Sequence, residues 1–147
     1  MRLIDYSWQK GYTCSTVSGK KRVLIVTDGA EEIKKMAENI AAALEGNSIL
    51  IKDGSNFAGT DLLPADVLFF GCEKPSPPSF GYLEELLQHI NLAGRTFGVF
   101  SPNSEEAIQY LIRMAKDSDA ALNAEPFLAE NSGNIKKWTT MVLAGKD

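Results

Sequence analysis

The sequence contains few of the residues that build metal centres, disulfide frameworks and basic surfaces. Its 147 residues include two cysteines and one histidine. A Cys/His metal site and a disulfide-rich scaffold are therefore not expected, and Cys14 and Cys72 lie far apart in the sequence. Fifteen Lys and Arg against nineteen Asp and Glu give a formal net charge of −4. This balance argues against nucleic acid or a membrane surface as the partner.

Long apolar runs are also missing. No run approaches the roughly 20 residues of a membrane span, and the first ten residues, "MRLIDYSWQK", lack the apolar core of a signal peptide. We therefore expect a cytoplasmic protein. The hydrophobic fraction of 44% and the charged fraction of 23% are typical of a globular domain, and the length is that of a single domain.

From residue 23 onward, strand patterns alternate with helix patterns. Apolar runs predict strands at 23–26, 48–54, 66–72 and 96–101, and a weaker fifth strand within 120–129. Apolar residues at helical spacing predict helices at 33–44, 83–90, 108–115 and 135–142. We expect Ser79 to cap the second of these helices and Asn103, with Glu106 at capping-box spacing, to cap the third. The Gly-rich segment 54–65 is too short for a full helix.

Strands that alternate with helices predict an α/β protein, a three-layer sandwich around a five-stranded parallel sheet of order 2-1-3-4-5. We assign this domain to residues 23–147. Residues 1–22 do not follow the pattern and form an N-terminal extension. The segment "RLIDYSWQ" could supply an extra edge strand. The favoured interpretation is an ordered or frayed extension, and the alternative is an arm that binds a protein partner through Tyr6, Trp8 and Tyr12.

Part of the sequence is similar to a known family. The segment "DLLPADVLFFGCEKPSPPSFGYLEELLQHINLAGRTFGVFS", residues 61–101, resembles the flavodoxin family. Its apolar strand ends in Gly, a Pro-bearing loop and an amphipathic helix follow, and "LAGR" matches that family's L-x-G-[KR] before the next strand. "DAALNAEPFLA" resembles the last strand, so the likeness covers about residues 22–145. The resemblance implies an electron carrier that binds flavin mononucleotide (FMN) and works with a redox partner, without acid–base catalysis of its own.

The resemblance also implies a cofactor site in the loops that follow the strands. The residues it assigns to this site are Thr27, Asp28, Gly29, Gly54, Phe57, Gly59, Gly71, Cys72 and Ser101. The first three belong to the phosphate loop, Phe57 is placed to stack on the flavin ring, and the glycines allow a close approach of backbone to the ring.

The phosphate loop departs from the family's pattern. The family's loop resembles S-x-T-G-x-T, whereas this sequence has "TDGAEEIKK", in which Asp28, Glu31 and Glu32 carry negative charge. Two like unit charges about 4 Å apart repel by roughly 1 kcal/mol in water and by about 4 in a partly screened site. The loop after the third strand also lacks an aromatic directly after the strand. Two hypotheses follow: a binding or regulatory module that does not hold FMN tightly, or a divergent FMN-binding electron-transfer flavodoxin.

The same architecture is also found in response-regulator receivers. Asp28 and Ser101 stand at strand ends, and "EPF" at 125–127 resembles the receiver's "KPF". However, the third strand ends in Gly71-Cys72 where a receiver needs its acceptor aspartate, and Glu125 stands where it needs lysine. An active receiver is therefore disfavoured.

A nucleophilic role for Cys72 is disfavoured as well. A reactive thiolate needs a paired base or a positive environment. Lys74 is near in sequence, but His89 falls on the polar side of its predicted helix. A phosphatase loop C-x5-R would need arginine where Pro78 stands. We expect Cys72 to be packed and inert, and His89 to be solvated.

Overall fold

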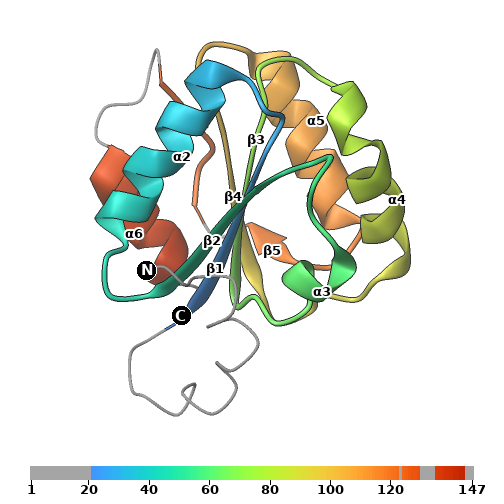
Figure 1. Cartoon of the computed structure of the whole chain (residues 1–147), viewed down its shortest axis with the longest axis horizontal. Helices are drawn as coiled ribbons and strands as arrows, with labels where there is room; N and C mark the ends of the chain where they lie inside the picture. The colour runs from blue at the N-terminus through green and yellow to red at the C-terminus, as the bar shows by residue number, and fades with distance from the viewer. Residues whose placement is uncertain (1–20, 123, 130–134, 145–147) are drawn as a thin grey trace.

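The computed structural model describes residues 21–122, 124–129 and 135–144. The strands are β1 (Arg22–Thr27), β2 (Ser48–Asp53), β3 (Val67–Gly71), β4 (Thr96–Ser101), β5 (Ala121–Leu122) and β6 (Phe127–Leu128). They form a parallel sheet of order β2-β1-β3-β4-β5, as predicted (Figure 1). The predicted fifth strand is divided in two. β5 pairs with the beginning of β4 and β6 with its end, and Pro126, which has no backbone N–H to donate, immediately precedes β6.

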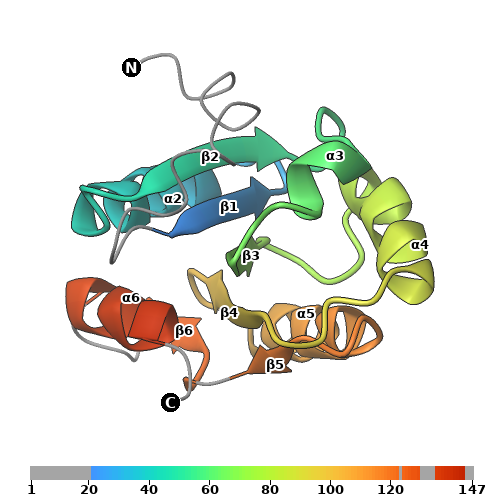
Figure 2. The same cartoon turned by 90° about the horizontal axis from the view of Figure 1, so that it is seen from below.

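Helices cover both faces of the sheet. They are α2 (Glu31–Ala43), α3 (Gly59–Leu62), α4 (Gly81–His89), α5 (Glu105–Lys116) and α6 (Ile135–Ala144). Figure 2 shows α2 and α6 on one face and α3, α4 and α5 on the other. The sheet between them makes the three-layer sandwich that the sequence pattern predicts. In the described residues no helix is long and apolar enough to cross a membrane.

Each face of the sheet has its own apolar core because side chains alternate along a strand. In β1, Leu24 and Val26 pack with the α4 and α5 side, whereas Val23 and Ile25 pack with the α2 and α6 side. All four are fully buried, and burial of such a side chain contributes about 1.5–3 kcal/mol. This two-sided burial explains why the strand reads as a continuous apolar run.

Two predicted helix caps are wrong. Ser79 lies inside a short 3₁₀ turn, η1 (Pro78–Phe80), and Phe80 occupies the N-cap position of α4. The prolines of this segment restrict the backbone angle φ. The chain therefore forms the 3₁₀ turn before α4 begins. At α5 the cap is Ser104, whose Oγ accepts a hydrogen bond from the N–H of Ala107 at 3.1 Å. Asn103 lies one residue too early for this role.

The N-terminal extension lies almost entirely outside the described residues, and the roles predicted for Tyr6, Trp8 and Tyr12 lie there too. The described chain begins at Lys21, whose N–H donates to Asn47 Oδ1 at 3.0 Å. The next residue, Arg22, begins β1 and donates its N–H to Asp66 Oδ2 at 2.9 Å. These contacts fix the start of β1 between the starts of β2 and β3.

Candidate functional site

The chain reverses its winding between β1 and β3. From β1 it passes through α2 to β2 on one side, and then returns through α3 to β3 on the other side. In open parallel sheets, ligands bind at such a switch point, beyond the carboxyl ends of the strands. A ligand is therefore expected at the loops after β1 and β3.

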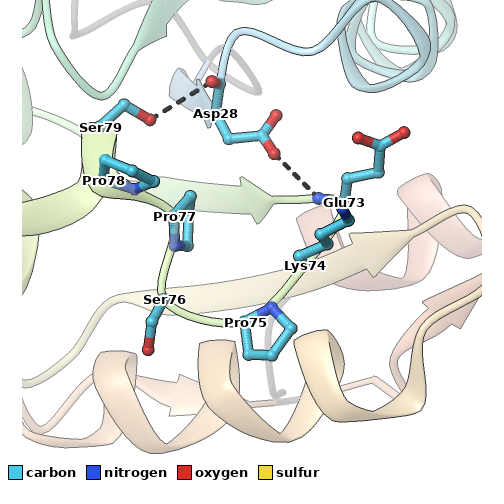
Figure 3. A pocket seen from close by; sticks show the side chains of 8 residues that line it. All are labelled: Asp28, Glu73, Lys74, Pro75, Ser76, Pro77, Pro78 and Ser79. Atoms are coloured by element: carbon cyan, nitrogen blue, oxygen red, sulfur yellow. Dashed lines mark hydrogen bonds between the residues drawn. The ribbon is translucent and has the colours of Figure 1, made fainter.

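The side chain of Asp28 joins these two loops. Its Oδ1 accepts a hydrogen bond from the N–H of Ala30 at 3.0 Å, and its Oδ2 accepts one from the N–H of Glu73 at 2.9 Å. The carbonyl oxygen of Asp28 accepts a third, from Ser79 Oγ, at 3.3 Å. Asp28 thus contacts both ends of the loop between β3 and α4 (Figure 3).

A crevice of about 480 Å³ lies between these loops. Figure 3 shows Asp28 on one side of it and the Pro-rich loop on the other. The lining residues are Asp28, Glu73, Lys74, Pro75, Ser76, Pro77, Pro78 and Ser79. Ser76 has a φ of 54°, a left-handed backbone that is uncommon outside glycine and costs of order 1 kcal/mol. The prolines around it restrict the loop to few conformations.

The beginning of α2 leaves backbone N–H groups without a partner inside the helix, as every helix N-terminus does. Thr27 is buried, and its hydroxyl accepts the N–H of Gly29 at 3.3 Å. Gly29 adopts a φ of 89°, which favours glycine. Ala30 is the N-cap residue of α2 and makes no side-chain cap. Glu31 and Glu32 follow in the first turn and are exposed, where they stabilise the positive end of the helix dipole.

The predicted site residues after β2 lie against other parts of the chain. A Cβ added to Gly54 would meet the carbonyl oxygen of Ser79 at 2.4 Å and Phe80 Cδ1 at 2.6 Å, so the close backbone approach at Gly54 is to the protein itself. Phe57 is only 6% exposed, and its ring lies 5.4 Å from that of Tyr82. Gly59 begins α3. None of these three residues is among those that line the crevice.

The predicted site residues at the ends of β3 and β4 form the floor under the loops. Gly71 packs beneath Phe100, because a Cβ on Gly71 would meet the Phe100 ring at 2.3 Å. Cys72 and Ser101 are fully buried. Within the described part of the chain, Ser101 Oγ has no hydrogen-bond partner.

The thiol of Cys72 is held in its neutral form. Burial raises its pKa to about 12, and the negative charge of Asp28 adds to the shift. A protonated thiol is a poor nucleophile, which agrees with the expectation of a packed, inert cysteine. His89 is exposed at the end of α4. The described residues contain no group of three or more His, Cys, Asp or Glu that could hold a metal ion.

Sequence reasoning missed the residues of the Pro-rich loop. Glu73 contributes its backbone N–H and Ser79 its hydroxyl to Asp28, and neither was assigned to the site. The signal was the "EKPSPPS" run itself, because three prolines in seven residues predict a loop of fixed shape. The partner of that loop lies 45 residues earlier in the chain, and the run alone does not identify it.

Comparison with known proteins supports the fold. Neither a protein-family profile nor a curated protein matches the sequence. Among solved structures, a short-chain flavodoxin associated with a bacterial microcompartment superposes with a TM-score of 0.73 at 14% identity, covering 85% of this chain and 97% of that one. A flavodoxin of Streptococcus pneumonia superposes with a TM-score of 0.72 at 16% identity, covering 85% and 99%.

A third structure is the Fusobacterium nucleatum flavodoxin bound to flavin mononucleotide. It superposes with a TM-score of 0.68 at 12% identity, covering 86% of this chain and 99% of that one. At such low identity these likenesses show the fold alone. The chain has a flavodoxin-like fold, as its sequence pattern predicts.

Proposed function

We propose that this chain is a flavodoxin-fold binding module whose first loop does not hold the phosphate of FMN tightly. The carboxylate of Asp28 carries this proposal, because it accepts the N–H groups of Ala30 and Glu73. A phosphate at a helix N-terminus depends on backbone donors of this kind. In this protein the Asp28 carboxylate already uses one such donor beside α2, the N–H of Ala30, and a second from the loop after β3, the N–H of Glu73.

Charge near the crevice adds to the effect. Asp28 and Glu73 line it, and Lys74 is the one cation among the lining residues. Glu31 and Glu32 follow Asp28 in the first turn of α2. A single like-charge contact at about 4 Å costs from roughly 1 kcal/mol in water to about 4 in a partly screened site. Because about 1.4 kcal/mol is a tenfold change in affinity, one such contact weakens a bound phosphate by between about fivefold and several hundredfold.

The other side of the crevice offers no stacking partner. The residues that line it include three prolines and no aromatic side chain. Phe57, which the resemblance places against a flavin ring, packs on Tyr82 instead. The lining of the crevice therefore offers a flavin ring no stacking side chain, and we assign no electron-transfer step to it.

A protein partner fits this surface better than a flat cofactor. The proline-rich loop presents a rim of fixed shape, and a rigid surface loses little conformational entropy when a partner binds. The carboxylates of Asp28, Glu31, Glu32 and Glu73 around the rim would meet polar or basic groups of that partner. The biological role would be regulatory, or that of an accessory to a redox protein.

A divergent FMN-binding electron carrier is the second candidate. The crevice lies at the β1/β3 switch point, where flavodoxins hold FMN, and its volume of about 480 Å³ suits a small molecule. The Fusobacterium nucleatum flavodoxin of the same fold is bound to FMN. In that case backbone groups of Gly71 and Cys72 would approach the ring, and the Asp28 side chain would turn away from the phosphate loop.

Flavin titration of two matched variants tests the proposal. Asp28→Ser removes the carboxylate from the N–H groups and restores a small hydroxyl, whereas Glu32→Gln removes one nearby charge without freeing any donor. We expect Asp28→Ser to bind FMN at least about ten times more tightly than the native chain, by quenching of flavin fluorescence. Glu32→Gln should gain much less.

Two results contradict the proposal. An equal gain from both variants would mean that overall charge, and not occupancy of the N–H groups by Asp28, limits binding. Tight binding by the native chain would establish the electron carrier instead. Circular dichroism of each variant verifies that it is folded during the titration.

A further inference from the structure

We propose that residues 2–9 of this chain bind along the outer edge of β2 as an antiparallel strand. Within the described residues, β2 pairs with β1 alone and stands at the end of the row of strands (Figure 2). Residues 2–9 lie outside the described residues. The inference is independent of what the crevice binds.

The hydrogen bonds of β2 show which of its backbone groups face outward. The N–H of Ser48 donates to the carbonyl of Lys21 at 3.0 Å, and the N–H of Gly54 donates to the carbonyl of Thr27 at 2.8 Å. Because backbone groups alternate in direction along a strand, Leu50 and Lys52 also face β1. The N–H and C=O groups of Ile49 and Ile51 therefore face away from the sheet.

The side chains at this edge are apolar and incompletely covered. Ile49 and Ile51 are register partners of Val23 and Ile25, so they lie on the α2 and α6 side. Ile51 remains 38% exposed. Natural proteins cover or charge an exposed edge strand to prevent pairing with other chains. Lys52 points to the opposite face, so within β2 the charge on the side of the two isoleucines is that of Asp53, at the carboxyl end of the strand.

The sequence of residues 2–9, "RLIDYSWQ", fits this edge. Ile4, Tyr6 and Trp8 alternate with Asp5, Ser7 and Gln9, and this period of two is typical of a strand with one buried face. Placed beside β2, the apolar set covers Ile49 and Ile51 while the polar set faces the other way. A one-residue shift would exchange the two sets, so the pattern also fixes the face.

The connection to β1 is long enough and begins at the right end of the sheet. Lys21 is bonded beside Ser48, at the amino end of β2. Residues 10–20 can extend about 35 Å, whereas the next strand position lies only about 5 Å beyond β2. If residues 2–9 end beside the amino end of β2, they run in the direction opposite to β2. Their pairing with β2 is therefore antiparallel.

Residue-resolved amide hydrogen exchange of the full chain tests the inference. We expect slow exchange at Ile49 and Ile51, and exchange there about ten or more times faster in the double variant Tyr6→Asp with Trp8→Asp. The amides of Leu50 and Lys52 bond to β1 and should stay protected in both proteins, which shows that the fold is kept. Ser7→Asp, on the polar face of the segment, is the matched control and should leave all four amides unchanged.

Two outcomes would overturn the proposal. Fast exchange at Ile49 and Ile51 in the native chain would mean that nothing pairs with this edge. Protection that is lost on dilution would mean that a second copy of the chain, and not residues 2–9, occupies it; sedimentation at the same concentrations identifies that dimer.

Discussion

The side chain of Asp28 accepts the backbone N–H of Glu73 at 2.9 Å, and this bond links the loops after β1 and β3 across 45 residues of sequence. The same carboxylate holds the N–H of Ala30 at the beginning of α2. One side chain therefore sets the distance between the two walls of the crevice.

Replacing Asp28 with alanine should destabilise the protein. Two backbone N–H groups lose their acceptor, and each partly exposed bond of this kind contributes about 1 kcal/mol, so we expect a loss of about 1–2 kcal/mol in the free energy of unfolding. Urea denaturation measures it. Glu32→Ala is the control, because Glu32 is exposed and sits in the same turn. Equal losses in both variants would show that the Asp28 bonds do not join the loops in solution.

Gly71→Ala should disrupt the packing between the ends of β3 and β4. The new Cβ would lie 2.3 Å from the Phe100 ring, and overpacking of a core typically costs about 1–3 kcal/mol. Gly81→Ala is the matched control, since Gly81 begins α4 with nothing within 4 Å of its Cβ position. That variant should be neutral or slightly stabilising, because alanine favours helix. Thermal unfolding of the two variants measures this difference. Gly71→Ala in a Phe100→Leu background, where the smaller side chain makes room for the methyl group, tests the packing directly.

The Cys72 thiol should resist alkylation in the folded protein. Its pKa is raised to about 12 by burial and by Asp28, so the reactive thiolate is scarce at pH 8. In a Cys14→Ser background, iodoacetamide should label Cys72 only as fast as the chain unfolds. Rapid labelling under native conditions would show that Cys72 is accessible.

The raised pKa of Cys72 also predicts how the free energy of unfolding depends on pH. An unfolded thiol loses its proton near pH 9, the ordinary value for cysteine, whereas the folded one keeps it to about pH 12. The contribution of Cys72 is therefore complete below about pH 9 and is lost as the pH rises toward 12. Cys72→Ala should lack this alkaline loss in urea unfolding measured across that range; an unchanged alkaline profile would assign the loss to other groups.

Asp53 should titrate below the usual range of an aspartate. The hydroxyl of Ser55 donates to its carboxylate and lowers its pKa, with smaller help from the Ser55 backbone N–H and Lys34. Its contribution to stability is present above the unfolded pKa of about 3.9 and is lost as the pH falls through the lowered folded value. Ser55→Ala should raise the pKa of Asp53, as read by NMR titration of its side-chain carbon. A pKa that does not move would mean that Ser55 is not the main cause.

The fold could be predicted because its signals are local. Continuous apolar runs such as 23–26 reveal strands buried on both faces, and their alternation with helical patterns fixes the parallel sheet. The residues that cap the helices were harder to predict from the sequence. Whether Ser79 or Phe80 caps α4 depends on the 3₁₀ turn Pro78–Phe80, and no spacing rule for caps describes that turn.

The site was predicted in part. The acidic character of the first loop was visible in the sequence, but the bonds from Asp28 to Ala30 and Glu73 depend on how two distant loops meet. Phe57 looked like a stacking residue because aromatic type alone does not reveal burial, and contact with Tyr82 places it in the core. Gly54 was expected to allow a close approach of backbone to a flavin ring, whereas the groups that lie close to it in the structure belong to Ser79 and Phe80.

The most direct test of the central claim is the visible spectrum of the purified protein, followed by titration with FMN under fluorescence detection. If Asp28 occupies the phosphate loop, the protein is colourless and leaves flavin fluorescence unchanged at tens of micromolar. A yellow protein, or quenching at submicromolar flavin, would contradict the account and identify an electron carrier.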